Sequence, residues 1–207
     1  MPIATAVANL SAKAEQCDSL IVSVHRLDGA GEEIFSQLDR EQITVAAFLN
    51  LFVAWEEFLE ATFSNFLVGE STLSGGAPIA YASPPDVELA KRMLIGTNRY
   101  FDYANHELVG KMASIYFKDG YPFKQTLDIM ASDFADLRTM RNASAHLSST
   151  TSQGLKSLAQ RIFGAPQTDI TLYELLTALD PRSVTGNTVF AEARDKLLTA
   201  ASLIAQG

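Results

Sequence analysis

Apolar residues recur along the chain at steps of three and four, a spacing that places them on one face of an α-helix. The first such segment covers residues 4–27 and is followed by the helix breaker Gly29. A longer segment, about 39–68, is apolar on nearly every side, with Asp39 as its expected N-cap. A helix that is apolar all round is normally central, so we expect neighbours on several of its faces.

Shorter helical segments follow a long loop at residues 69–85. We expect them at about 86–95, 106–117, 123–145, 153–163, 171–179 and 188–205. Asn105 and Asn187 are the expected caps of two of them. Val and Ile are sparse and do not alternate, so no sheet is expected. The sequence predicts an all-α helical bundle, a single domain over residues 1–207 with its core at about 40–200 and extra peripheral helices.

The composition is that of a globular protein, with 47% hydrophobic and 19% charged residues. The formal net charge of −8 argues against a broad basic surface for duplex DNA. It leaves room for a small phosphate site, because one arginine in a cleft can bind a phosphate at any total charge.

Several features favour a cytoplasmic protein outside the membrane. Cys17 is the only cysteine, so no intrachain disulfide can form. The first residues lack the basic and apolar regions of a signal peptide. The most apolar stretch, Ile43 to Trp55, is too short to span a bilayer and runs into Glu56 and Glu57.

The three histidines and one cysteine show no metal-ligand spacing, and the chain has neither a glycine-rich phosphate loop nor a nucleophile elbow. We therefore expect no metal and no cofactor. The segment that carries candidate chemistry is Arg141-Asn142-Ala143-Ser144-Ala145-His146. Arg141 continues an apolar stripe of its helix, and a buried guanidinium is costly unless it is paired or faces a ligand.

Arg141 and His146 are five residues apart, which is roughly 140° around a straight helix. Two side chains at that offset cannot converge on one phosphate. Either the helix breaks near Ser144, or a twofold axis brings two copies of the segment into one cleft.

An arginine, a polar residue and then a histidine at this spacing resembles the Arg-x₄₋₆-His motif of the HEPN superfamily. The order of elements is also similar: a long helix containing residues 52–60, an insertion, and a helix that ends in Arg141-Asn142-x₃-His146. The chain looks closest to RiboL-PSP-HEPN and MAE-type HEPN-like nucleases over roughly residues 40–200. A second match, Arg99 to His106, has Tyr100 after the arginine and spans an expected helix boundary, so we interpret it as a coincidence.

The resemblance implies a metal-independent endoribonuclease, expected as a toxin or phage-defence effector, in which the ribose 2′-OH attacks the adjacent phosphate. His146 would be the general acid or base, Arg141 would neutralise charge on the phosphoryl oxygens, and Asn142 would orient the histidine or bind phosphate. The implied partners are RNA, a second copy that completes a composite active site, and a cognate antitoxin protein.

Two alternatives stay open. Arg141 and His146 could instead be cations that neutralise the end of a helix, and the chain a catalytically silent HEPN-like module for dimerisation or protein interaction. Arg138, Glu56 and Glu60 are expected to support the site. Glu56 is expected in a structural ion pair with Arg138 or Arg141.

Overall fold

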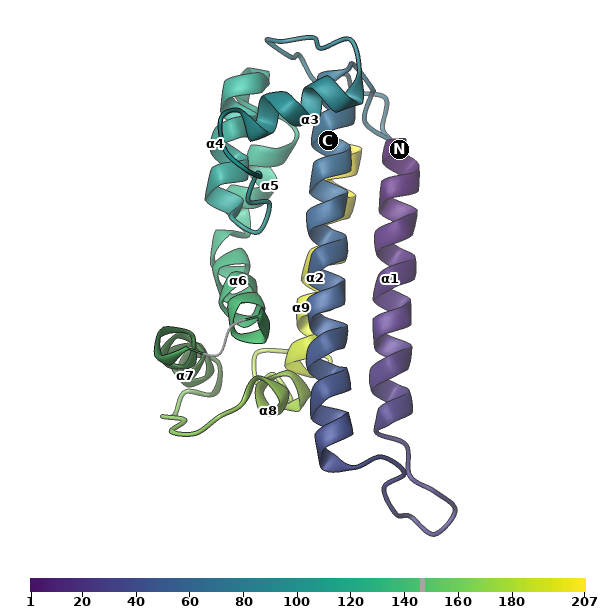
Figure 1. Ribbon diagram of the computed structural model, residues 1–207, viewed down its shortest axis with the longest axis vertical. Coiled ribbons are helices and arrows are strands. Elements are labelled where there is room, and N and C mark those ends of the chain that lie inside the picture. The colour runs from purple at the N-terminus through teal and green to yellow at the C-terminus, as the bar shows by residue number, and fades with distance from the viewer. Residues whose placement is uncertain (146–147) are drawn as a thin grey trace. The chain divides into compact units, whose positions relative to one another are not determined.

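The computed structural model describes residues 1–145 and 148–207, and helices joined by turns make up its regular elements (Figure 1). In order, they are α1 (Ile3–Val24), α2 (Gln37–Leu67), α3 (Val87–Ile95), α4 (His106–Tyr116), the 3₁₀ turn η1 (Lys118–Gly120), α5 (Phe123–Ile129), α6 (Ala131–Ala145), α7 (Ser149–Phe163), α8 (Leu172–Thr177) and α9 (Val189–Gln206). No strand occurs in the described part of the chain, where β-pairing is limited to isolated bridges. The prediction of an all-α helical bundle is confirmed.

The chain forms two compact units, each built from separate stretches of sequence. Unit 1 comprises Met1–Ser11, Ala54–Ala135 and Leu197–Gly207, and unit 2 comprises Ala12–Val53 and Asp136–Lys196. By these bounds α1, α2, α6 and α9 contribute residues to both units, α3, α4 and α5 belong to unit 1, and α7 and α8 belong to unit 2. The single domain expected over residues 1–207 stays a prediction.

Local capping signals fix several helix ends where the sequence placed them. The side chain of Asp86 accepts the N–H of Leu89 at the start of α3, and that of Asn105 accepts the N–H of Leu108 at the start of α4. Gly96 ends α3 with a positive φ of 59°. Each of these residues satisfies a backbone group that the helix end leaves without a partner.

Other helix starts differ from the prediction. The cap of α2 is Ser36, whose hydroxyl accepts the N–H of Asp39, so Asp39 lies inside the first turn. Thr188, and not Asn187, accepts the N–H of Ala191 at the start of α9. A capping box between Ser148 and Thr151 starts α7 at Ser149, four residues earlier than expected.

The helix expected over 123–145 is wrong as a single element, because it divides into α5 and α6 at Met130. Met130 has φ −97° and ψ 16°, and its N–H is shared between the carbonyls of Thr126 and Asp128. This tightening of the last turn ends α5 before α6 begins. The apolar stripe that leads to Arg141 is therefore not one face of a straight helix.

An aromatic cluster around Phe63 of α2 lies in the core of unit 1. Phe63 is fully buried, and its ring centroid lies 4.8 Å from that of Phe123, 5.2 Å from that of Phe117 and 6.3 Å from that of Tyr116. These contacts attach the segment between α4 and α5 to α2, so this part of α2 is central to its unit, as predicted.

The whole of α2, Gln37–Leu67, is longer than the apolar stretch Ile43 to Trp55, which alone is too short to span a bilayer. It is the one described helix long and apolar enough to cross a membrane, although half of its most apolar window is buried inside protein. A buried core helix meets the same test of length and composition.

Unit 2 is held together by an apolar core and by contacts between segments far apart in sequence. Arg194 on α9 forms an ion pair with Asp18 on α1. The Nε2 atom of His25 lies 3.1 Å from the hydroxyl of Tyr173 on α8, and the two rings are stacked. Fully or nearly fully buried side chains of α7 and α8 form part of the core: Leu155, Leu158, Ala159, Ile162, Leu175 and Leu176.

Candidate functional site

The candidate site begins on α6, which carries three of the predicted residues within unit 2. Arg138, Arg141 and Asn142 are separated by three and four residues, so they fall within about 100° of the helix surface. All three are half-buried. The last turns of α6 therefore present two guanidinium groups and one amide on one face, a set suited to phosphate oxygens.

Arg141 lies inside the helix and not at its extreme end. Its Nε atom is buried, and the hydroxyl of Ser144 donates a 2.7 Å hydrogen bond to its carbonyl. The last turn of α6, which ends at Ala145, contains no basic residue. The alternative in which Arg141 and His146 neutralise the helix end stays open, because His146 lies outside the described residues.

His146, the predicted general acid or base, lies outside the described residues, as does Leu147. The described part of α6 ends at Ala145, and Ser148 caps α7. The convergence of His146 on Arg141 and Asn142 therefore stays a prediction.

Asp136, one turn and a half before Arg141 on α6, anchors an ion-pair network that the sequence did not reveal. Its carboxylate pairs with Arg161 of α7 and lies 3.8 Å from Arg182. Arg182 also donates two hydrogen bonds, of 2.9 and 2.7 Å, to Asp180 and lowers the pKa of that buried carboxyl. The network joins three segments distant in sequence, so no local spacing could have indicated it. It fixes the part of α6 that leads to Arg141.

The predicted supporting acids lie on α2, within unit 1. Glu60 accepts from Lys91 of α3 at 2.6 Å and raises the pKa of that lysine. Burial, and then the charge of Glu60, raise the pKa of Tyr103. Glu60 thus has a structural partner on α3. Glu56 is half-buried, and its pairing with Arg138 or Arg141 stays a prediction.

The second Arg-x₆-His match contains two residues with different surroundings in unit 1. His106 is half-buried at the first position of α4, and its ring is stacked on Phe134 with centroids 5.8 Å apart. Arg99 is exposed and precedes the cap Asn105 by six residues. His106 therefore has a packing role, which accounts for its position without chemistry.

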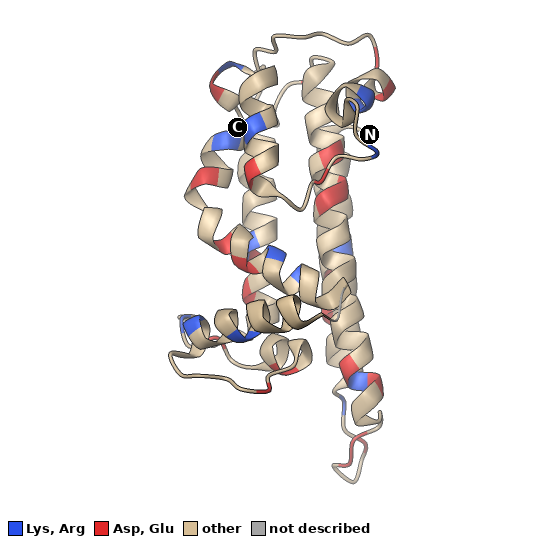
Figure 2. Cartoon of the chain, turned by 60° about the vertical axis from the view of Figure 1, so that its left-hand side comes forward, with Lys and Arg blue, Asp and Glu red and all other residues tan. Residues whose placement is uncertain are grey.

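The described side chains can also be compared with the arrangements that bind metal ions. Over residues 1–145 and 148–207, no group of three or more His, Cys, Asp or Glu side chains is placed to hold a metal ion. Figure 2 shows Lys, Arg, Asp and Glu scattered over the described helices, with long uncharged stretches between them.

Comparisons with protein-family models, with curated proteins and with solved structures found no match to this chain.

Proposed function

We propose that this protein is a metal-independent endoribonuclease of the HEPN type, acting in the cytoplasm as a toxin or phage-defence effector. The observation that supports it best is the cluster on α6. Two arginines and an asparagine share one half-buried face within the last two turns before His146.

The local charge supports the same proposal. Residues 136–196 contain seven Lys and Arg against six Asp and Glu, whereas the whole chain has a formal charge of −8. Within this segment, arginines already neutralise Asp136 and Asp180. A phosphate backbone that approaches this segment thus meets a nearly balanced local charge, although unit 2 as a whole, which also includes Ala12–Val53, contains ten Lys and Arg against thirteen Asp and Glu.

The proposed reaction is an internal transfer at one RNA phosphodiester. The ribose 2′-oxygen forms a bond to phosphorus as its proton passes to a base, and the bond to the 5′-oxygen breaks as that oxygen gains a proton. His146 takes one of these proton-transfer roles, because an unperturbed histidine has a pKa near about 6.5. Arg141 stabilises the charge on the phosphoryl oxygens, and Asn142 binds phosphate or orients the histidine. The products are a 2′,3′-cyclic phosphate and a 5′-hydroxyl.

We expect RNA cleavage to proceed at an unchanged rate in excess EDTA, because proton transfer by His146 and charge stabilisation by Arg141 take the roles that a metal ion would otherwise have. The measurement is cleavage of a labelled RNA by protein dialysed against chelator. Loss of cleavage on chelation that magnesium or manganese restores would contradict the proposal.

The second candidate is a catalytically silent HEPN-like module that dimerises or binds a protein partner. The net acidic charge favours it, since RNA must approach against repulsion. A folded, dimeric protein that cleaves no RNA under any metal condition would decide for this alternative. In either case a cognate antitoxin is a candidate partner.

We expect a homodimer whose interface includes the end of α6. A twofold axis there would bring Arg141 and His146 of both chains into one cleft. Arg141 of one chain could then act with His146 of the other, although the two residues lie roughly 140° apart around a straight helix. Light scattering at micromolar concentration should give twice the 22.5 kDa mass of the chain. Cleavage per chain should also rise with protein concentration. A strict monomer that cleaves RNA equally well at all dilutions would show that one chain suffices.

A further inference from the structure

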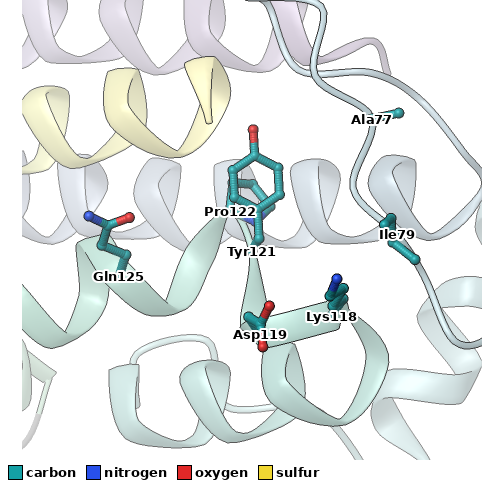
Figure 3. Close-up of a pocket in the computed structure, with 7 residues that line it drawn as sticks. All are labelled: Ala77, Ile79, Lys118, Asp119, Tyr121, Pro122 and Gln125. Atoms are coloured by element: carbon teal, nitrogen blue, oxygen red, sulfur yellow. The ribbon is translucent and has the colours of Figure 1, made fainter.

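A surface hollow in unit 1 lies between the loop before α3 and the start of α5. Its volume is about 340 Å³, within the range of about 300–1,000 Å³ typical of small-molecule sites. The residues that line it are Ala77, Ile79, Lys118, Asp119, Tyr121, Pro122 and Gln125 (Figure 3). None of them belongs to the α6 cluster, so the hollow needs an explanation of its own.

The backbone under the hollow has an unusual conformation at Asp119. This residue has φ 58° and ψ 13°, in the left-handed region that aspartate tolerates better than most side chains. Two hydrogen bonds hold the turn: the N–H of Lys118 donates to Ile79 at 2.9 Å, and that of Gly120 donates to Phe117 at 3.0 Å. The turn fixes the backbone of Asp119, whose side chain lines the hollow.

The ring of Tyr121 offers an aromatic surface on which a flat ligand can stack. Figure 3 shows it near the middle of the lining residues, with Asp119 and Lys118 on one side and Gln125 on another. Its hydroxyl packs so closely against Gly76 that a Cβ there would lie 2.9 Å away, and a Cβ on Gly207 would also collide with it. The ring is thus held at its tip, while the residue keeps 37% of its surface exposed.

The polar groups around the ring are available to a ligand. Among the described residues, no side-chain hydrogen bond or ion pair engages Lys118, Asp119 or Gln125. An aromatic floor with hydrogen-bonding side chains at its rim is the arrangement by which proteins hold an unpaired base, stacked on the ring and read along its Watson–Crick edge.

We propose that this hollow binds an unpaired guanine base of RNA, stacked on Tyr121. Guanine presents two neighbouring donors, N1–H and the N2 amino group, which match the two oxygens of the Asp119 carboxylate. Uracil presents one N–H between two carbonyl oxygens, which the carboxylate repels. Lys118, on the same side of the ring as Asp119, can donate to the neighbouring guanine O6 oxygen, and Gln125, on another side, is left for the ribose or phosphate. The inference rests on the proposed function, because it assigns a base preference to an RNA-cleaving protein.

The test is calorimetric titration of the full chain with guanosine 5′-monophosphate and, separately, with uridine 5′-monophosphate. The two probes share ribose and phosphate, so a difference reports the base. We expect measurable binding of the guanosine nucleotide and at least about tenfold weaker binding of the uridine nucleotide. Asp119→Asn keeps a side chain that tolerates the left-handed backbone and removes the charge, so it should weaken guanosine nucleotide binding by about tenfold or more.

The matched control is Asp128→Asn on α5, which removes an exposed carboxylate that pairs with Lys124 outside this hollow. It should leave guanosine nucleotide binding unchanged. No binding of the guanosine nucleotide, equal binding of both nucleotides, or full binding by Asp119→Asn would each overturn the inference.

An arm with Arg141→Ala separates this inference from the proposed function. That variant should bind the guanosine nucleotide as the wild type does and fail to cleave RNA. If the wild type cleaves RNA but binds the guanosine and uridine nucleotides equally well, only the guanine site is overturned. Discrimination without any cleavage overturns the nuclease and leaves a guanine-binding hollow.

Discussion

Replacing His146 with alanine is expected to lower the rate of RNA cleavage about 10²–10⁴-fold, the usual contribution of a general acid or base. The melting temperature should change little, because a histidine that serves proton transfer and not packing is expected to contribute no more than about 0.5 kcal/mol to stability. The measurement is cleavage of a labelled RNA by the purified variant, with a thermal melt of the same preparation. If His146 is catalytic, its alanine variant should therefore lose activity while keeping the stability of the folded protein.

The comparison variant is His106→Ala, which removes the histidine of the second Arg-x₆-His match. It should keep cleavage by the folded protein. Its melting temperature should fall moderately, since the His106 ring packs on the buried Phe134. The reverse pattern would contradict the proposed roles: a His146→Ala protein that melts many degrees lower but cleaves normally while folded, or a cleavage defect confined to His106→Ala.

Phe63→Ala is expected to destabilise the protein by about 3–5 kcal/mol, the usual loss when a buried phenylalanine is truncated in a packed core. Phe63 is 0% exposed and lies in contact range of three other aromatic rings, so its removal leaves a cavity that rigid neighbours cannot fill. The loss is a large fraction of the roughly 5–15 kcal/mol that stabilises a typical protein.

Chemical denaturation of Phe63→Ala beside Ile129→Ala tests this packing. Ile129 is 76% exposed on α5, so its truncation should change the free energy of unfolding by no more than about 0.5 kcal/mol. Equal, small effects of the two substitutions would mean that Phe63 does not lie in the core of unit 1. Because Phe63 packs on Phe117 and Phe123, which flank the guanine hollow, partial unfolding should also weaken nucleotide binding.

Features that depend on neighbouring residues could be predicted from the sequence. The steps of apolar residues identified the helical segments, and the cap Asn105 was predicted because it acts on a backbone group three residues away. Asp86, expected as the first residue of its helix, is instead the cap of α3. The cap Ser36 was missed although Asp39 stands three residues later, because the acidic residue itself is a good capping type. The sequence placed Arg141 on the apolar stripe of its helix, but the grouping of Arg138, Arg141 and Asn142 within about 100° of the α6 surface was recognised only with the structure.

Features that join distant segments could not be predicted in the same way. Met130 continues the apolar pattern, and no glycine or proline marks the break between α5 and α6. The network at Asp136 joins α6, α7 and the segment before α9. The guanine hollow combines the loop at Ile79 with the turn at Asp119. The Asp119-Gly120 pair signals only a turn in the sequence.

The chemistry of the RNA ends tests the proposed activity most directly. RNA cleaved by the wild-type protein in EDTA should carry a 2′,3′-cyclic phosphate on one fragment and a 5′-hydroxyl on the other, because the attacking group is the neighbouring 2′-oxygen. An RNA with a 2′-deoxy sugar at the cleavage position should stay intact. Fragments with 3′-hydroxyl and 5′-phosphate ends, or cleavage of the 2′-deoxy substrate, would contradict a HEPN-type nuclease that uses Arg141 and His146.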